Sequence, residues 1–568
     1  MTITYADKPW IKEYDKGVRD TIDFPEHTVH YFLEESARKF PDNNALIFKD
    51  KKISYRELND ITDAIAASLI ANGFKKGDRA VIYMPNLPQF VMAYFGILKA
   101  GGIAIATNPL YSKRELEHQL GDCGAETVFV MSRYYNLLKE VQAAGHTNVK
   151  RIIVTNVKDY FPTKLRILFT LLKEKKEGDR VNLADGDVRF KDFIEAGSTL
   201  PRPNIEVSSN DPALLQYTGG TTGLAKGATG LHRNLVSNTY VLQEWVEWEA
   251  GKEGFLASIP FFHVYGMVTA LIFSIAVAGE MIIIVNPRDQ KDLLGSINKY
   301  GPSIFPGVPA MYIGINNNPD VIAGKYDISS IRACISGSAP LLMDTKLEFE
   351  RLTGGKLVEG FGMTETFVAT HANPLNGVPR PGSIGLPLPN VECKIMDADT
   401  GEDELPVGEI GELVVKSPSV MQGYWQMPTE TENTLRDGWL YTGDIARMDE
   451  DGYFYIESRK KDMIIAGGYN IYPREVEEVL SGHPDVLEVA VAGIPHPRRG
   501  ETVKAWVVLK PGSTLTEEEL INWSKEGLAK YKYPRMIDFI EELPKSTVGK
   551  VLKRELVREY KEQQAAGK

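Results

Sequence analysis

A glycine- and threonine-rich stretch at residues 217–227, Y-T-G-G-T-T-G-L-A-K-G, has the residue types of a polyphosphate-binding loop. Its glycines permit backbone conformations that aim successive N–H groups at one anion, and its threonines add hydroxyl donors. Lys226 is followed by Gly227 and not by serine or threonine, so the stretch does not fit G-x-x-x-x-G-K-[ST], which disfavours a kinase or P-loop ATPase. The expected phosphate contacts are Thr218, Gly219, Gly220, Thr221, Thr222, Gly223 and Lys226.

The hydrophobic residues before this loop bear on a second interpretation, a flexible glycine-threonine linker. Ala213, Leu214 and Leu215 form a short apolar run that predicts a buried strand leading into the loop. A buried strand gives the loop a fixed origin. The phosphate-binding interpretation is therefore favoured over the linker.

Five further stretches follow in the chain: G-S-A-P at 337–340, E-G-F-G-M-T-E-T at 359–366, Y-T-G-D-I at 441–445, R-K-K-D-M-I-I-A-G-G-Y-N-I-Y-P-R-E at 459–475, and P-K-S-T-V-G-K at 544–550. With the loop, they resemble the motifs of the adenylate-forming superfamily of acyl-CoA synthetases, luciferases and nonribosomal-peptide adenylation domains. Because the matches occur in the superfamily's order, they are far more specific together than singly. Within it, the chain most resembles bacterial long-chain fatty-acid–CoA ligases.

The resemblance implies an ATP- and Mg²⁺-dependent fatty acid–CoA ligase. A medium- or long-chain acid would be activated as acyl-AMP with release of pyrophosphate, and CoA would then take the acyl group and release AMP. Two alternatives stay open. An acyl-AMP ligase would load a carrier protein and would make no acyl-CoA by itself, whereas a catalytically inactive, membrane-associated lipid-binding protein would release no pyrophosphate.

The first step needs positive charge, because joining a carboxylate to an α-phosphate brings two anions together. The Coulomb cost is about 4 kcal/mol per pair of unit charges at ~4 Å with an effective dielectric of ~20. Lys226 and Mg²⁺ are expected to supply that charge. By resemblance, Glu365 is the metal contact and Thr364 meets a phosphate oxygen. Read alone, Glu365 would be a solvated turn residue.

The resemblance also implies the contacts to the nucleoside. Phe361 would stand against adenine, and Asp444 would accept the ribose hydroxyls with Arg459 as a second polar contact. A turn-capping aspartate after Gly443 is the alternative for Asp444. The other implied nucleotide contacts are Gly337, Ser338, Ala339 and Gly362.

The resemblance also implies roles for two lysines and two adjacent glycines in the C-terminal part of the chain. Lys550 would neutralise charge on the acyl carboxylate and the ribose oxygens as the adenylate forms, although alone it reads as one solvated cation in a basic tail. Gly467 and Gly468 would leave room for the pantetheine arm of CoA, whose thiol of pKa ~8.5 needs no strong base. Lys461, two residues after Arg459, is the expected hinge between two orientations of a small domain.

Residues 261–267, F-F-H-V-Y-G-M, resemble the superfamily's aromatic motif near the acyl tunnel. A histidine packed in the core is the alternative for its histidine. Met267 stands where some long-chain relatives carry tryptophan, which argues against gating of the tunnel by an indole. The implied substrate contacts are His263, Tyr265 and Val308.

The elements that must position these residues follow an α/β pattern. From residue 28 helix and strand signals alternate, with strands at 80–84, 103–106 and 127–131, which predicts sheets covered by helices. After Arg459 the pattern becomes a small α+β one, with helices at 475–480 and 517–528 and strands at 487–491 and 503–509. We expect an N-terminal ATP- and acyl-binding domain at 1–459 and a smaller, mobile C-terminal domain at 460–568.

Length, composition and charge fit this interpretation. A chain of 568 residues exceeds one ordinary core, and its net charge of −11 disfavours a nucleic-acid-binding protein. Three separated cysteines lack metal-ligand spacing and suggest reduced thiols in the cytoplasm. The N-terminus lacks a signal pattern, and the apolar run at 267–285 reads as a buried helix and strand. The sequence leaves a homodimer open.

One segment, 162–178, departs from the alternating pattern. Leu165, Leu168, Phe169 and Leu172 recur at helical spacing, and basic residues flank them. Such a helix is typical of a segment that lies on an anionic membrane, which would make the protein peripheral on the inner face of the membrane. An ordinary surface helix with its apolar face on the core is the alternative.

Overall fold

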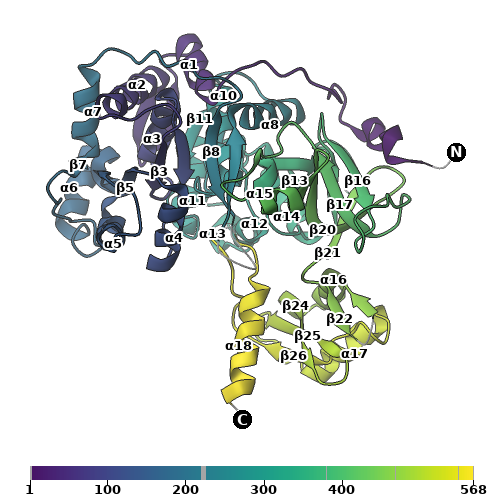
Figure 1. Ribbon diagram of the computed structural model, residues 1–568. Coiled ribbons are helices and arrows are strands. Elements are labelled where there is room, and N and C mark those ends of the chain that lie inside the picture. The colour runs from purple at the N-terminus through teal and green to yellow at the C-terminus, as the bar shows by residue number, and fades with distance from the viewer. Residues whose placement is uncertain are drawn as a thin grey trace.

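The protein is described by a computed structural model that covers residues 3–218, 225–378, 380, 382–466, 469–547 and 549–566. Figure 1 shows a large part formed by the N-terminal and middle regions, and a smaller C-terminal part below it. This confirms the predicted fold class, in which sheets covered by helices are followed by a small α+β unit. The boundary at residues 459 and 460 stays a prediction.

The first large sheet contains the strand that leads into the phosphate loop. Among the described residues it has eight strands, and the inner ones pair in parallel. Their spatial order is β18 (Gly423–Tyr424), β9 (Gly227–Leu231), β8 (Pro212–Tyr217), β4 (Ile103–Ala106), β3 (Arg79–Tyr83), β5 (Thr127–Met131), β6 (Arg151–Thr155) and β7 (Val188–Arg189).

A second, four-stranded sheet runs in the order β10 (Gly254–Ala257), β11 (Glu280–Ile283), β1 (Asn44–Phe48) and β2 (Lys51–Ser54). Ile304 forms parallel bridges to Phe255 on β10 and to Ala333 on β12, and so links it to a third sheet. The strands described in that sheet are β12 (Ala333–Ser336), β13 (Lys356–Met363), β14 (Val368–Ala372), β15 (Ser383–Pro387), β21 (Phe454–Arg459), β20 (Trp439–Met448), β17 (Gly411–Lys416) and β16 (Glu392–Met396), with β19 (Leu435–Arg436) beside β20.

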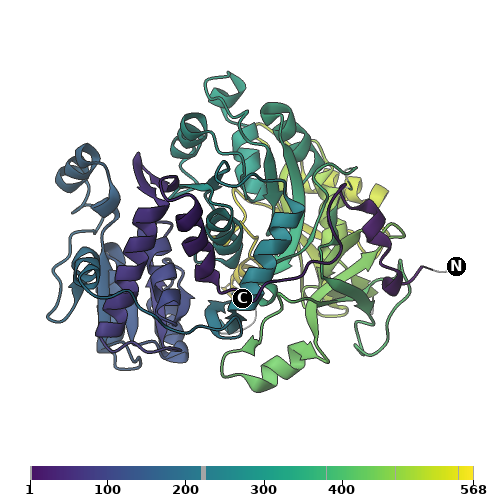
Figure 2. The ribbon, with the colours of Figure 1, turned by 90° about the horizontal axis from the view of Figure 1, so that it is seen from above.

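Side chains alternate between the two faces of each strand, so both faces of these sheets carry apolar side chains. Helices cover both faces (Figures 1 and 2). In β3, Ile82 faces the core between the first two sheets, whereas Val81 faces the opposite side. The inner core contains residues of α1 (Val29–Lys39), α2 (Tyr55–Ala71), α3 (Pro88–Lys99), α7 (Phe190–Ser198), α8 (His232–Trp245) and α10 (Phe273–Ala276). The outer helices are α4 (Lys113–Cys123) and α5 (Ser132–Ala143) on the first sheet, and α11 (Gln290–Tyr300), α12 (Pro309–Asn316) and α14 (Met343–Thr353) on the second.

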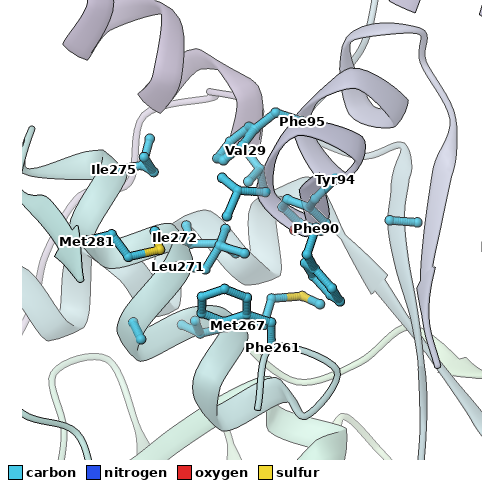
Figure 3. Close-up of a cluster of buried hydrophobic side chains, with 14 of the residues drawn as sticks. Val29, Phe90, Tyr94, Phe95, Phe261, Met267, Leu271, Ile272, Ile275 and Met281 are labelled. Carbon is cyan, nitrogen blue, oxygen red and sulfur yellow. The ribbon is translucent and has the colours of Figure 1, made fainter. Parts of the chain in front are cut away.

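The apolar run after the aromatic motif is buried, as predicted. It forms α9 (Val264–Gly266), a π-helical stretch (Met267–Ile272), α10 and β11. Figure 3 shows Met267, Leu271 and Ile272 packed near Phe90 and Tyr94 of α3. Among the described residues, no helix has the length and apolar character needed to cross a bilayer.

The small C-terminal unit has its own five-stranded sheet among the described residues. Its strands are β23 (Tyr469–Ile471), β22 (Ile464–Ala466), β25 (Gly500–Leu509), β24 (Val486–His496) and β26 (Met536–Phe539). Residues of α16 (Pro473–Ser481) and α17 (Glu517–Gly527) pack in one core on this sheet, and Leu556 of α18 (Lys553–Ala566) packs in a second. The predicted helices and strands of this unit are confirmed, with ends that differ by a few residues.

The remaining short helices precede the first strand or lie in the connections between later elements. They are the 3₁₀ turns Tyr5–Asp7, Pro9–Glu13, Val157–Tyr160 and Thr364–Thr366, together with α6 (Thr163–Leu172), α13 (Pro319–Ile322) and α15 (Pro428–Thr434).

Candidate active site

The phosphate loop is a connection between two antiparallel strands. Tyr217, at the end of β8, pairs with Gly227, at the start of β9. The Thr218 amide donates to the Lys226 carbonyl over 2.9 Å, which closes the base of the loop. The predicted contacts Gly219, Gly220, Thr221, Thr222 and Gly223 lie outside the described residues.

Lys226 lies among groups that can bind phosphate or metal. Its ammonium forms an ion pair with Glu430 of α15 and stands 5.1 Å from the centre of the Tyr424 ring. The Tyr424 hydroxyl donates to Glu365 Oε1 over 2.7 Å. Burial, and then the Glu365 carboxylate, raises the pKa of Tyr424, so its hydroxyl stays protonated and remains a donor. A cation and two carboxylates therefore meet at one place.

Glu365 is held by the turn in which it lies. The 3₁₀ turn Thr364–Thr366 follows β13 directly, and the Met421 amide donates to the Glu365 carbonyl over 2.8 Å. This turn places both Thr364 and Glu365 half-buried at the end of the strand. A glycine is required at position 362, just before this turn, because a Cβ there would lie 1.4 Å from the Val368 carbonyl oxygen.

The predicted adenine contacts come from two neighbouring parallel strands, β12 and β13. Phe361 is half-buried on β13, with its ring 5.9 Å from that of His371. Gly337, Ser338 and Ala339 follow β12, and Ser338 has a left-handed φ of 70°.

Tyr265 supports the turn that begins at Gly337. Its hydroxyl bonds to the carbonyls of Ile335 at 2.6 Å and Gly307 at 3.0 Å, and a Cβ on Gly337 would lie 3.2 Å from its ring. The hydroxyl is thus committed to the backbone. Any contact of Tyr265 with an acyl group would be through its ring.

Asp444 and Arg459 face each other on the paired strands β20 and β21. Asp444 is only 2% exposed, and its Oδ1 lies 2.7 Å from Arg459 Nε. Its Oδ2 is buried and has no hydrogen-bond partner among the described residues. Burial raises the pKa of Asp444, and the Arg459 guanidinium opposes that rise. An unpaired buried carboxylate oxygen is costly, so this position suits a ligand that donates hydroxyl hydrogens.

Lys550 reaches the same place from the small unit. Lys550 lies at the end of a turn in which the Ser546 amide donates to the Lys550 carbonyl over 2.8 Å. Gly549 in that turn has a φ of 76°. A Cβ on Gly549 would lie 3.4 Å from Val308 Cγ2 at the start of α12, so the turn contacts the large part directly. Figure 1 shows this yellow segment rising from α18 toward the large part.

The electrostatics of Lys550 show which groups surround it. Lys550 is exposed, but the protein near its ammonium, and then the Arg459 guanidinium, lowers the pKa of Lys550 to about 8, while Asp444 and Asp462 oppose that shift. Burial, and then the charge of Lys550, lowers the pKa of His263 to about 4. His263 is therefore neutral at pH 7, and its Nδ1 accepts from the Tyr265 amide over 3.2 Å.

Lys461, the predicted hinge, lies in the connection between β21 and β22. The Lys460 amide donates to the Gly443 carbonyl over 2.9 Å, and the Asp462 amide donates to the Arg459 carbonyl over 2.9 Å. Burial, and then Arg459, lowers the pKa of Lys461. Gly467 and Gly468, predicted to border the pantetheine path, lie outside the described residues.

Two residues of this site were missed by sequence reasoning, Tyr424 and Glu430. They contact Glu365 and Lys226, from which they are separated by 59 and 204 positions. A single tyrosine and a single glutamate carry no local signal at such separations. Only the pairing of β18 with β9, which brings residues 423–424 beside the loop strand, reveals them.

The chain matches two protein-family descriptions. Residues 33–425 match the family described as AMP-binding enzyme, and residues 475–550 match the AMP-binding enzyme C-terminal domain. The chain therefore belongs to the AMP-binding enzyme family, within the adenylate-forming superfamily.

Individual relatives cover nearly the whole chain. A long-chain-fatty-acid–CoA ligase of Bacillus subtilis (strain 168) is 44% identical over 98% of this chain and 99% of that protein. The structure of ATP-bound MatB from Rhodopseudomonas palustris has a TM-score of 0.81 and 31% identity, covering 94% of this chain and 99% of that one. The anthranilate CoA ligase AuaEII in complex with anthranoyl-AMP has a TM-score of 0.83 and 26% identity, covering 99% and 100%.

Proposed function

We propose that this chain is a fatty acid–CoA ligase that converts a long-chain acid, ATP and CoA into acyl-CoA, AMP and pyrophosphate. The observation that carries the proposal is the meeting of Lys550, from the small unit, with the buried Asp444–Arg459 pair of the large part. A relative 44% identical to the chain is named as a ligase of this kind. The acid class is proposed from such names.

In the first step, a carboxylate oxygen of the acid attacks the α-phosphorus of ATP. The bond from the α-phosphorus to the bridging oxygen breaks, and pyrophosphate leaves with that electron pair. Asp444 Oδ2 would accept a ribose hydroxyl and so hold the nucleoside, and Lys226 would exchange its ion pair with Glu430 for the phosphates. Lys550 would offset the repulsion between the two anions, an effect that is strongest in a site with little water.

Glu365 fits the role of magnesium contact. Its Oε1 accepts the Tyr424 hydroxyl, and the second oxygen would be available to a cation. Among the described residues, no group of three or more His, Cys, Asp or Glu side chains is placed to hold a metal. Mg²⁺ commonly takes one or two carboxylates and completes its shell with waters and substrate phosphates, so one glutamate suffices. When bound, the ion would neutralise charge on the polyphosphate.

In the second step, the CoA thiol loses its proton to water and its sulfur attacks the acyl carbonyl. A carbon–sulfur bond forms, the bond from the acyl carbon to the phosphate oxygen breaks, and AMP leaves with that electron pair. We assign the pantetheine path to residues 467–472, whose two glycines would let the arm pass. CoA is preferred over a carrier protein as acceptor because two relatives that match nearly the whole chain are named as CoA ligases. A carrier-loading ligase is the alternative, and it would make no acyl-CoA from acyl-AMP and CoA.

The acyl chain would find an apolar environment next to the proposed reacting groups. His263 stands close enough to Lys550 to sense its charge, and the buried π-helical stretch Met267–Ile272 begins four residues later. We propose that the carboxyl end lies near His263 and Val308 and that the chain extends toward Met267. Methionine is flexible and fills irregular apolar space, which suits chains of several lengths.

The location and the assembly of the enzyme are part of the proposal. Because ATP and CoA are soluble and the three cysteines are buried and unpaired, we place the enzyme in the cytoplasm. A long-chain acid partitions into bilayers, so we also place it at the periphery of the inner membrane face. A homodimer stays a prediction, which light scattering of the purified protein would measure.

The test is release of pyrophosphate by the purified protein with ATP, Mg²⁺ and acids from acetate to palmitate, without any carrier protein. We expect the highest kcat/KM with long-chain acids, and one acyl-CoA and one AMP per pyrophosphate when CoA is present. Pyrophosphate release without acyl-CoA would support the carrier-loading ligase. No pyrophosphate with any acid would overturn the proposal and favour the inactive lipid-binding protein.

A further inference from the structure

Helix α6 exposes several large apolar side chains to solvent. The exposed fractions are 54% for Ile167, 54% for Leu168, 75% for Leu171 and 66% for Leu172. No residue of this helix is buried. Of the apolar residues at helical spacing, Leu165 and Phe169 are half-buried, whereas Leu168 and Leu172 are exposed, so the core covers only part of the apolar face. Figure 1 shows α6 at the outer edge of the large part.

A different side of the helix fixes it to the protein. Phe169 packs edge-on against Phe161 at 5.6 Å, and Phe161 stacks on the buried Phe48 at 5.6 Å. The Lys158 ammonium donates to Thr170 Oγ1 over 3.1 Å and pairs with Glu174 at 2.6 Å. The helix is thus anchored through Phe169 and its C-terminal turn, and this anchor leaves the four residues named above exposed.

Basic residues surround the exposed apolar face, in a chain whose net charge is −11. All are exposed, and no ion pair involves them in the part of the chain that the structure describes: Lys164, Arg166, Lys173, Lys175 and Lys176. The nearby acids are already neutralised, because Glu174 pairs with Lys158 and Glu177 pairs with Arg133 at 3.0 Å. The α6 surface, defined as residues 164–176, is therefore apolar at its centre and positive at its rim.

We propose that the α6 surface docks the enzyme on a bilayer that contains anionic phospholipids. A helix of ten residues is about 15 Å long, half the thickness of a hydrocarbon core, so α6 would lie in the plane of the interface. Its leucines would enter the boundary between headgroups and acyl chains, and its lysines would meet lipid phosphates. A second copy of this acidic chain matches a positive rim less well than a uniformly anionic lipid surface.

Docking deepens the proposed function by naming the surface through which a bilayer would supply the acid. The inference rests on the proposed function only for that purpose, because vesicle binding is measurable without turnover. Pyrophosphate release with a short, soluble acid reports the proposed function in the absence of vesicles. Failure of the docking inference is therefore distinguishable from failure of the proposed ligase function.

The experiment measures cosedimentation of the full-length protein with phosphatidylcholine vesicles, with and without phosphatidylglycerol. One variant carries Leu171→Ser and Leu172→Ser, and a second carries Lys173→Gln, Lys175→Gln and Lys176→Gln. The apolar control carries Ile322→Ser and Leu347→Ser, which change exposed residues of α13 and α14. The charge control changes the same net charge at exposed positions elsewhere: Lys356→Gln, Lys510→Gln and Lys561→Gln.

We expect the wild type to bind vesicles that contain phosphatidylglycerol and to lose affinity as salt rises. The affinity of the leucine variant for these vesicles should fall by at least about tenfold. The affinity of the lysine variant should fall by about fivefold for each charge removed, at low salt. Both controls should bind as the wild type does. Unchanged melting temperatures and unchanged pyrophosphate release with a soluble acid would show that the variants are folded.

Three outcomes would overturn the proposal. The wild type could fail to bind anionic vesicles, the α6 variants could bind as well as their controls, or the charge control could lose as much affinity as the lysine variant. The last result would assign binding to net charge and not to this surface. Self-association that disappears with Leu171→Ser and Leu172→Ser, without vesicle binding, would make a second copy the occupant.

Discussion

Lys226 has one anionic partner among the described residues, Glu430, and this pair allows a matched test of its role. Lys226→Ala should slow adenylate formation by about 10²–10³-fold, the effect of losing one preorganised donor to developing charge. Glu430→Gln breaks the same ion pair but keeps the lysine, so it should leave the rate near that of the wild type and lower KM for ATP. Pyrophosphate release under single turnover measures both. Equal losses in the two variants would mean that the ion pair is structural.

The lowered pKa of Lys550 predicts a pH limit for the first step. An ordinary lysine is charged up to pH ~10, whereas Lys550 loses its proton near pH 8 in the free enzyme. Because the charged form is the active one, kcat/KM for pyrophosphate release without CoA should fall as pH rises through about 8. Lys550→Arg keeps its charge at every accessible pH, so its residual activity should not show this fall. A fall at the same pH in that variant would assign the titration to another group.

At the scale of residues, motif order identified side chains but not their partners. Asp444 and Arg459 were each expected at the nucleotide, and their pairing across β20 and β21 explains why one oxygen of Asp444 remains unsatisfied. Tyr424 and Glu430 were not found, because contacts between distant segments leave no periodic signal in one sequence. The steric need for Gly362 was likewise invisible, since it depends on a backbone oxygen of the next strand.

Helix α16 holds the small unit in the orientation seen here. Arg474 donates to the carbonyls of Ile456 at 2.8 Å and Gly382 at 3.0 Å, both in the large part. Bonds from a charged donor contribute about 1.5–3 kcal/mol each, so their loss should lower the population of this orientation.

Arg474→Met should therefore slow adenylation by tenfold or more and leave thioester formation from supplied acyl-AMP unchanged or faster. Arg351→Met, which removes a surface arginine of α14 paired with Glu348, is the control and should change neither rate. Stopped-flow pyrophosphate release and thioester formation measure the two steps. If Arg474→Met slowed both equally, the contacts would not select an orientation.

At the scale of elements, periodicity predicted most of the architecture. The strands at 103–106 and 127–131 were predicted with the bounds that the structure has. Helix α6 shows what the periodicity of apolar residues does not determine. Its spacing of leucines is the same whether the apolar face is covered or exposed, so only the packing of its neighbours decides.

At the scale of the whole molecule, the two units contact each other in an orientation that we propose is the one for the first step. The Gly549 turn contacts Val308, and Lys550 senses Asp444 across the boundary. The resemblance implied two orientations, and motif order does not say which one a structure adopts, because motifs fix residues within each unit and not the angle between units. The second orientation stays a prediction, with Lys461 as the proposed hinge.

A fixed hinge would separate the two steps. Lys461→Pro would restrict φ at that position and is expected to trap one orientation, so it should change the two half-reactions by different factors. Adenylation from ATP and acid, and thioester formation from supplied acyl-AMP and CoA, are the two rates to compare. A proportional loss in both would remove the need for a hinge at Lys461.

The most direct test of the whole account measures both half-reactions on Lys550→Ala and Gly468→Leu, beside the wild type. Lys550→Ala should lose pyrophosphate release from ATP and a long-chain acid but still convert supplied acyl-AMP and CoA into acyl-CoA. Gly468→Leu should keep pyrophosphate release and block the conversion of acyl-AMP. Adenylation by Lys550→Ala at the wild-type rate would contradict the account, because the lysine that the small unit places beside Asp444 and Arg459 would then have no part in forming the adenylate.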